Sequence, residues 1–201
     1  MDKLNILFLA GSPNEDCCSR FLFSQIATSY QDKINVTACA PLQLPIFTNN
    51  RDYRKCPQSE MLEHLITKAD AVVIASPSHN DTISCYLKNI IDHTSMPRGS
   101  NFWYQKPVGV IAFAEYMHNS AHSRDDLLHL LQYIGADVCT EPAVNFCRSR
   151  NIPGSDGEIL QILDQILVSD LMDNVLQKAA AHKATRYCKP EHEISLWNSW
   201  Y

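Results

Sequence analysis

A turn rich in small polar residues, from Gly11 to Ser19, lies between an apolar run and a segment with helical periodicity. Free backbone N–H groups at the start of a helix, together with the hydroxyls of Ser12 and Ser19, form a favourable environment for a phosphate. The competing interpretation is ordinary helix capping by Ser19 or Asp16. The turn has neither the GxGxxG nor the GxxxxGK[ST] pattern, which disfavours nicotinamide-binding Rossmann proteins and nucleoside triphosphatases.

Apolar runs and helical stripes alternate along the whole chain, which predicts an α/β fold with a parallel sheet and helices on both faces. We expect strands over residues 4–9, 34–40, 71–75, 108–113 and 136–144, and helices over 19–30, 61–66, 86–96, 127–134 and 159–181. Residues 41–57 are predicted to form a long surface loop. In such a sheet, ligands bind at the carboxyl ends of the strands, so the turns after the first, third and fourth strands are the candidate site.

The composition favours one domain over residues 1–201, because 45% of the chain is hydrophobic and its length suits a single core. The net charge of -5 comes from acids and bases spread along the sequence, so we expect no nucleic-acid partner. The short apolar run near the start resembles neither a signal peptide nor a membrane span, and we expect a cytoplasmic protein without membrane contact.

Cysteine and histidine spacing gives no support for a metal site. The eight cysteines contain no CxxC pair, and we expect them to be reduced thiols. His118 and His122 stand four residues apart without an evident third ligand, so we expect solvated side chains rather than a metal centre.

Two stretches together carry a resemblance to a known family. Residues 75–83 read ASPSHNDTI and residues 87–92 read LKNIID, which resembles the T-P-E-Y-N-x-S-I-P-x-x-L-K-N-x-I-D segment of the NAD(P)H-dependent FMN reductases. The GSP turn at 11–13, LPIF at 44–47, Ala69-Asp70 and KPVG at 106–109 extend the resemblance from about residue 4 to residue 145.

The resemblance implies a three-layer flavodoxin-like fold whose five-stranded parallel sheet has the order 2-1-3-4-5. It also implies an FMN cofactor, NAD(P)H as co-substrate and hydride transfer through the flavin to a small acceptor such as a flavin or a quinone. Because flavin chemistry needs no acid–base residue of the protein, no catalytic side chain is expected. Members of the family are commonly homodimers or homotetramers, and we expect the same here.

The family also implies which residues bind the flavin, and they fall into three groups. The phosphate group is Ser12, Asn14, Cys17, Cys18 and Ser19; the ribityl and ring group is Pro77, Ser78, His79 and Asn80; and the third loop contributes Phe113, Ala114 and Glu115. Within the well-matched LKNIID stretch, Lys88, Asn89 and Asp92 are expected to serve packing, capping or subunit contacts.

Several positions depart from the family pattern. Members often have Arg at the position of Asn14, Ser at Cys17 and Tyr at His79, and their third loop is commonly rich in glycine. Two alternatives therefore stay open: a flavin-dependent dehydrogenase or tailoring enzyme acting on a bound organic substrate, and a flavin-binding electron carrier or regulatory module. The aromatic segments 101–104 and 196–201 suggest a subunit interface.

Overall fold

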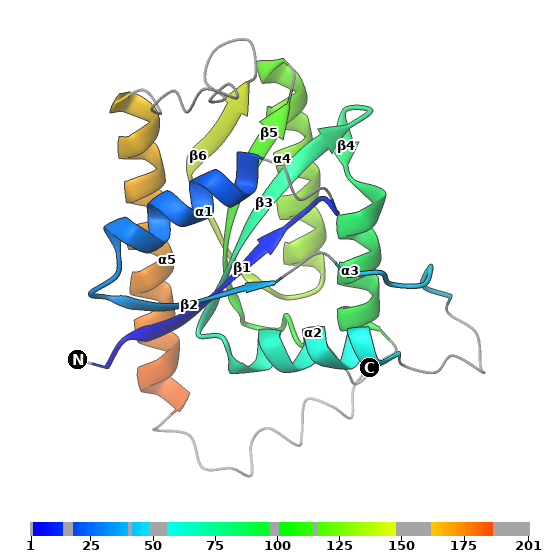
Figure 1. Cartoon of the computed structure of the whole chain (residues 1–201), viewed down its shortest axis with the longest axis horizontal. Helices are drawn as coiled ribbons and strands as arrows, with labels where there is room; N and C mark the ends of the chain where they lie inside the picture. Colours follow the sequence, from blue (N-terminus) through cyan, green and yellow to red (C-terminus); the bar gives the residue numbers. More distant parts are fainter. Residues whose placement is uncertain are drawn as a thin grey trace.

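A parallel sheet with helices on both faces forms the centre of the computed structural model (Figure 1). The structure describes residues 2–13, 18–39, 42–48, 56–96, 101–114, 116–147 and 162–186. The strands are β1 (Leu4–Ala10), β2 (Ile34–Cys39), β3 (Ala71–His79), β4 (Thr82–Ile83), β5 (Pro107–Ala114) and β6 (Asp137–Cys147). The helices are α1 (Cys18–Ser29), α2 (Pro57–Lys68), α3 (Cys85–Ser95), α4 (Met117–Tyr133) and α5 (Ile162–Arg186).

The five main strands are parallel and lie in the order β2-β1-β3-β5-β6. Counted without the short β4, this is the order 2-1-3-4-5, so the predicted flavodoxin-like sheet is confirmed. The two-residue β4 was not predicted; it pairs antiparallel with the end of β3. The turn between them has positive φ at Asn80 and Asp81, a conformation that these two residue types tolerate better than most.

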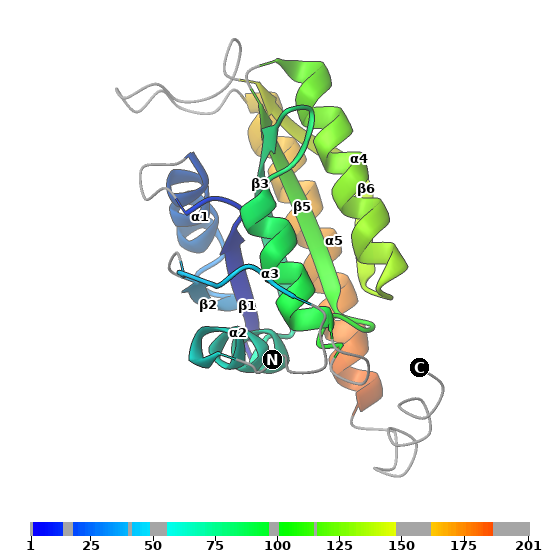
Figure 2. The ribbon, with the colours of Figure 1, turned by 90° about the vertical axis from the view of Figure 1, so that its right-hand side faces the viewer.

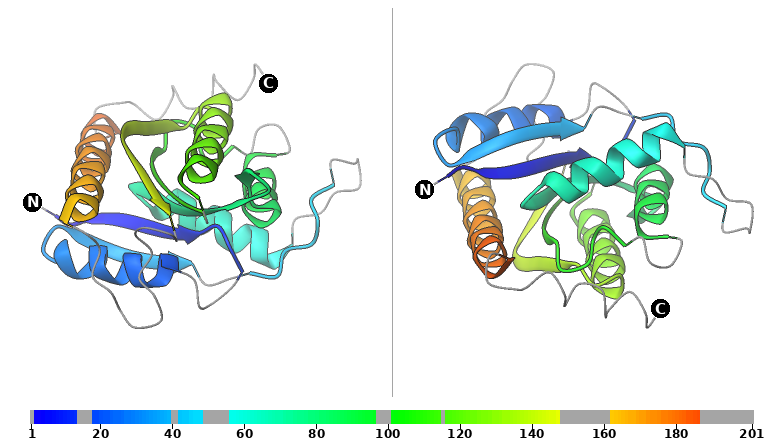
Figure 3. Two further views of the ribbon diagram at one scale, coloured as in Figure 1. Left: turned by 90° about the horizontal axis from the view of Figure 1, so that it is seen from above. Right: turned by 90° about the horizontal axis from the view of Figure 1, so that it is seen from below.

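Each face of the sheet has its own hydrophobic core, because the central strands β1, β3 and β5 are apolar on both sides, as expected for buried parallel strands. On one face α1 and α5 cover Ile6, Phe8 and Val73. On the other face α2, α3 and α4 cover Leu7, Leu9 and the rest of a second cluster. Figure 3 shows the two helical layers on either side of the sheet.

The helix α4 begins ten residues before the apolar stripe that predicted it. Its first half is polar in sequence, yet Ser120 and Ser123 are fully buried there and Arg124 nearly so. Small hydroxyl side chains allow a helix to lie close to the sheet without an apolar stripe, which is why periodicity missed this half. The predicted stop at Gly135 is found: its φ is +84°, and a Cβ there would lie 2.8 Å from Tyr104 Cδ2.

The aromatic segment 101–104 was interpreted as a subunit interface, and for Trp103 this is wrong. Trp103 is fully buried within the second core, and its indole N–H donates to Thr94 Oγ1 at 2.7 Å. Because α3 supplies this acceptor, the indole needs no second subunit for burial. The other aromatic segment, 196–201, lies outside the described residues.

None of the helices in the described part of the chain is long and apolar enough to cross a membrane. The four cysteines whose thiols are described, Cys39, Cys56, Cys85 and Cys139, are all unbridged. Burial raises the pKa of the Cys139 thiol to about 11, so this cysteine is a buried apolar side chain rather than a reactive thiol.

Candidate functional site

The turns after β1 and β3 are held together by three close contacts. The Gly11 N–H donates to the Ala75 carbonyl at 2.7 Å, and the Ser84 hydroxyl donates to the Gly11 carbonyl at 2.5 Å. A Cβ at position 11 would lie 2.9 Å from Pro77 Cδ, so only glycine allows this approach. The two turns that the sequence singled out therefore form one rigid unit.

The phosphate residues lie at the two ends of the first turn. Ser12 follows β1 and Ser19 lies in the first turn of α1, and both are buried. Cys18 is the first residue of α1. Asn14 and Cys17 lie outside the described residues. Seven residues separate the carboxyl end of β1 from the start of α1, and a helix N-terminus favours an anion.

A pocket of about 490 Å³ opens beside this unit, between the β3–β4 turn, the end of β5 and the first turns of α4. In Figures 1 and 2 the β3–β4 turn and the start of α4 lie next to each other at the upper edge of the sheet. The pocket is lined by Ser78, Asn80, Asp81, Ala114, Tyr116, His118 and Asn119.

Ser78, which lines this pocket, and two residues on neighbouring strand positions carry polar atoms without partners. Among the described residues, the buried Oγ of Ser76, Oγ of Ser78 and Oδ1 of Asn145 have no hydrogen-bond partner. The strand register places Ser76, Ala112 and Asn145 side by side on the face that α4 covers, and Ser78 lies two residues further along β3. Buried polar groups are rarely left unsatisfied, so their arrangement beside a pocket is typical of a ligand site.

The β3–β4 turn is anchored to α4 through the carboxylate of Asp81. Asn119 Nδ2 donates to Asp81 Oδ1 at 2.8 Å, and His122 Nδ1 lies 2.8 Å from Asp81 Oδ2. The hydrogen bond from His122 lowers the pKa of Asp81, and the same contact raises the pKa of His122. Next to this anchor, Thr82 Oγ1 donates to Asp126 Oδ2 at 2.5 Å.

Aromatic rings stand on the α4 side of the pocket. The Tyr116 and His118 rings are stacked, with their centroids 6.0 Å apart and their planes 14° apart. The His118 ring meets the His122 ring edge-on, with a centroid distance of 6.4 Å. Tyr116 and His118, which line the pocket with nearly parallel rings, give it a flat aromatic wall.

The structure brings together part of the predicted site. Ser78, Asn80 and Ala114 line the pocket, and Pro77 contacts the glycine turn. His79 is exposed and does not line the pocket. Phe113 points to the opposite face, where its ring stacks on Phe146 at 5.3 Å. Glu115 lies outside the described residues.

Asp81, His118 and Asn119 line the pocket but were not predicted as site residues. The spacing of His118 and His122 was noticed, but without the fold nothing in the sequence connects α4 with Asp81. The Asn80-Asp81 pair was the available signal, because these residue types favour turns with positive φ.

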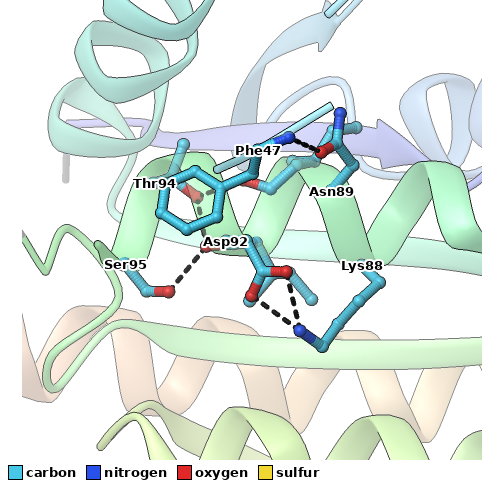
Figure 4. Close-up of polar contacts among 8 residues, drawn as sticks. Phe47, Lys88, Asn89, Asp92, Thr94 and Ser95 are labelled. Carbon is cyan, nitrogen blue, oxygen red and sulfur yellow. Dashed lines mark hydrogen bonds and ion pairs between the residues drawn. The ribbon is translucent and has the colours of Figure 1, made fainter. Parts of the chain in front are cut away.

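The helix α3, which carries the LKNIID stretch, holds the segment that follows β2. The Asn89 side chain accepts from the Phe47 N–H at 2.8 Å (Figure 4). It also donates to the Pro45 carbonyl at 2.9 Å. Lys88 and Asp92 form an ion pair one turn apart on the same helix, at 2.7 Å. None of these three side chains lines the pocket.

Comparison with known proteins identifies a family and several relatives. Residues 4–150 match the sequence model of the NADPH-dependent FMN reductases. An NADPH azoreductase of Bacillus sp. (strain OY1-2) is 25% identical over 111 residues, which cover 55% of this chain and 59% of that protein. A 2-hydroxy-1,4-benzoquinone reductase of Burkholderia sp is 21% identical over 78% of this chain and 86% of its own length.

Among solved structures, the flavoenzyme NAD(P)H:(acceptor) oxidoreductase FerB from Paracoccus denitrificans superimposes with a TM-score of 0.76. The superposition covers 89% of this chain and 98% of FerB at 19% identity. At that identity the likeness establishes the fold alone.

Proposed function

The chain belongs to the NADPH-dependent FMN reductase family, and from this premise we propose that it transfers hydride from NAD(P)H through FMN to a quinone or a similar small planar acceptor. In the overall reaction NAD(P)H loses two electrons and one proton as hydride. The acceptor gains two electrons and two protons, of which the second comes from solvent. The names of the quinone- and azo-reducing relatives support this acceptor class.

The observation that carries the proposal is the pocket at the carboxyl ends of β3 and β5, with the unpartnered Ser78 Oγ on its wall. It is formed by the same turns to which the family resemblance assigns the flavin. A hydroxyl that lacks a partner among the described residues offers both a donor and an acceptor to a polar ligand. The residues present therefore fit an FMN group.

When bound, FMN supplies the two-electron redox chemistry, by accepting hydride from the nicotinamide and passing it to the acceptor. Ser12, Ser19 and the start of α1 would hold its phosphate. Ser78, Asn80 and Ala114 would contact the ribityl chain and ring from the strand side of the pocket, and the space beside Asp81 and the α4 wall would be left for the acceptor. The other residues of the predicted set would keep the parts that the family implies. Asn14, Cys17 and Cys18 would belong to the phosphate group, Pro77 and His79 to the ribityl and ring group, and Phe113 and Glu115 to the third loop.

Anaerobic reduction tests this function directly. We expect the purified protein, reconstituted with FMN, to be yellow, to bleach on addition of NADPH or NADH, and to regain its colour when a benzoquinone is added. Protein that stays yellow with both nicotinamides would point to the electron-carrier or tailoring alternatives. Protein that does not bind FMN at all would refute every flavin-dependent function.

We also propose a cytoplasmic homo-oligomer, either a dimer or a tetramer, as the family resemblance implies. Surface residues such as Ile46, which is 86% exposed, and the exposed Tyr133 are apolar groups that a subunit contact would cover. Light scattering coupled to gel filtration measures the mass, and a single monomer mass at micromolar concentration would refute the proposal.

A further inference from the structure

A fixed negative charge lies on the wall of the pocket. The side chain of Asp81 is 45% exposed, yet both of its oxygens are engaged, one by Asn119 and one by His122. Its backbone lies in the left-handed region, with φ of 64°. Two hydrogen bonds and a tight turn hold the carboxylate in one orientation beside the space that an acceptor would enter.

Positive charge near this carboxylate comes from histidine. The lining of the pocket, as far as the chain is described, includes neither lysine nor arginine. Arg124, on the same helix, is nearly buried and its guanidinium donates to the Thr140 carbonyl and contacts Asp125. Asp125 and Asp126 of α4 add negative charge behind His122. Once His122 is neutral, the local balance is therefore negative.

Besides this negative charge, the second feature of the pocket is its flat aromatic wall. Tyr116 is 58% exposed, and the plane of its ring is nearly parallel to that of the His118 ring. Exposed aromatic faces offer a stacking surface to planar rings. Shape and charge are thus set by different residues.

We propose that this pocket selects planar acceptors that carry no negative charge, with Asp81 as the residue that rejects anionic molecules of the same shape. The inference rests on the proposed function and names its substrate class: uncharged or cationic quinones and related rings are accepted, and sulfonated or carboxylated ones are disfavoured. The physical cause is repulsion between the half-exposed Asp81 carboxylate and the anionic group of the ligand, and added salt weakens this repulsion.

Binding without turnover is the first test. Naphthalene-2-sulfonamide and naphthalene-2-sulfonate have one ring system and differ in charge, and their binding is followed by the change in the visible absorbance of the FMN-loaded protein. We expect the sulfonamide to bind more tightly. Asp81→Asn is expected to improve sulfonate binding about three- to tenfold at low salt and to leave sulfonamide binding unchanged. Asparagine tolerates the positive φ and retains an oxygen that can accept one hydrogen bond, so the turn is expected to survive.

Turnover is the second test, with 1,2-naphthoquinone and its 4-sulfonate as acceptors. The quantity compared is the ratio of the two kcat/KM values in each variant, which cancels the different reduction potentials of the quinones. We expect Asp81→Asn to shift this ratio toward the sulfonate, and Asp32→Asn, an exposed carboxylate before β2 at the far end of the sheet, to leave it unchanged.

The proton on His122 makes the selection depend on pH. Below the raised pKa of His122 the Asp81–His122 pair is neutral, and above it the pair carries one negative charge. Discrimination against the sulfonate should therefore grow as pH rises through that pKa in the native protein. In Asp81→Asn the pair changes from cationic to neutral instead, so the pH dependence should move to lower pH, and the net repulsion of the sulfonate at high pH should be lost. The titratable groups His118, Asp125 and Asp126 of α4 face the same pair and are present in both variants.

The outcomes separate the inference from the function. If NADPH reduces the bound flavin and both quinones react, but Asp81→Asn leaves the ratio and the sulfonate affinity unchanged, the inference is wrong and the function stands. If NADPH does not reduce the flavin, the proposed function fails, and the naphthalene pair still tests the charge selection by itself.

Discussion

At the scale of single residues, the site combines backbone geometry with short polar side chains rather than with a catalytic triad. Gly11 permits contact between two turns, and Ser12 and Ser19 border the start of α1. Asp81 lies one residue beyond the predicted ring group and is the carboxylate that ties β3 to α4. A hydride-transfer protein needs little more, since orientation and electrostatics govern the flavin.

The first prediction concerns the phosphate. Ser12→Ala combined with Ser19→Ala is expected to weaken FMN binding by roughly 1–3 kcal/mol, because phosphate oxygens would lose hydroxyl donors. Fluorescence titration of FMN measures the change. Ser29→Ala, at the exposed end of α1, is the matched control and should bind FMN normally. An unchanged affinity in the double variant, with the thermal midpoint preserved, would place the phosphate elsewhere.

At the scale of elements, α3 acts as a support for the chain that follows β2. Tyr86, Asn89 and His93 are spaced three and four residues apart and so lie along one side of the helix. The Leu42 N–H donates to the Tyr86 hydroxyl at 2.9 Å, and His93 Nε2 lies 2.9 Å from the Pro45 carbonyl. The LKN part of the family pattern therefore has a structural role in this chain. Its Asn89 binds the segment 42–47, and its Lys88 forms the ion pair with Asp92.

The second prediction tests this support. Asn89→Ala removes the acceptor of the Phe47 N–H and the donor to the Pro45 carbonyl. It should raise amide exchange at Phe47 by about fivefold, as expected for a loss of about 1 kcal/mol. Lys88→Ala, on the same helix, breaks only the ion pair with Asp92 and is the control. Equal exchange at Phe47 in Asn89→Ala and the native protein would contradict this role for α3.

At the scale of the whole molecule, α5 joins the far edge of the sheet to its centre. Lys178 Nζ lies 2.5 Å from Asp137 Oδ1 and His182 Nε2 lies 2.9 Å from Asp137 Oδ2, at the start of β6. Lys183 reaches Asp70, just before β3. A Cβ on Gly109 would lie 2.7 Å from Val175 Cγ2, which shows how closely α5 approaches β5. The helix thus binds the amino ends of the strands, opposite the pocket.

The third prediction is the acid sensitivity of this contact. Desolvation by itself would raise the pKa of Asp137, but the hydrogen bonds from Lys178 and His182 outweigh it and the pKa is lowered. A carboxylate with a lowered pKa stabilises the fold above its unfolded value of about 3.9, and this contribution is lost as pH falls through the folded pKa. Between pH 7 and pH 3 the native protein should therefore lose more stability than Asp137→Asn.

Urea denaturation at several pH values measures the difference. The gap between the two unfolding free energies should narrow toward the acid end of the range, as the pH approaches the lowered pKa of the native carboxyl. Asp32→Asn, which removes an exposed carboxylate, should instead follow the native protein throughout. A constant gap between the native protein and Asp137→Asn across the range would show that protonation of Asp137 has no part in the acid response.

Much of the fold was predictable, because buried parallel strands are apolar on both faces and their helices show periodic stripes. The strands from residues 4, 34, 71 and 108, the stop at Gly135 and the order of the sheet all followed from pattern and resemblance. The polar first half of α4 did not, since Ser120 and Ser123 are buried without being apolar.

The sequence by itself determined the family, the sheet and the turns at which a flavin is expected, since local patterns and ordered motifs specify these. Only the tertiary structure decided which side chains share the pocket. Phe113 and Ala114 are neighbours in sequence but point to opposite faces of β5, because side chains alternate along a strand. Asp81 and His122 are 41 residues apart and meet because the sheet places the β3–β4 turn beside the start of α4.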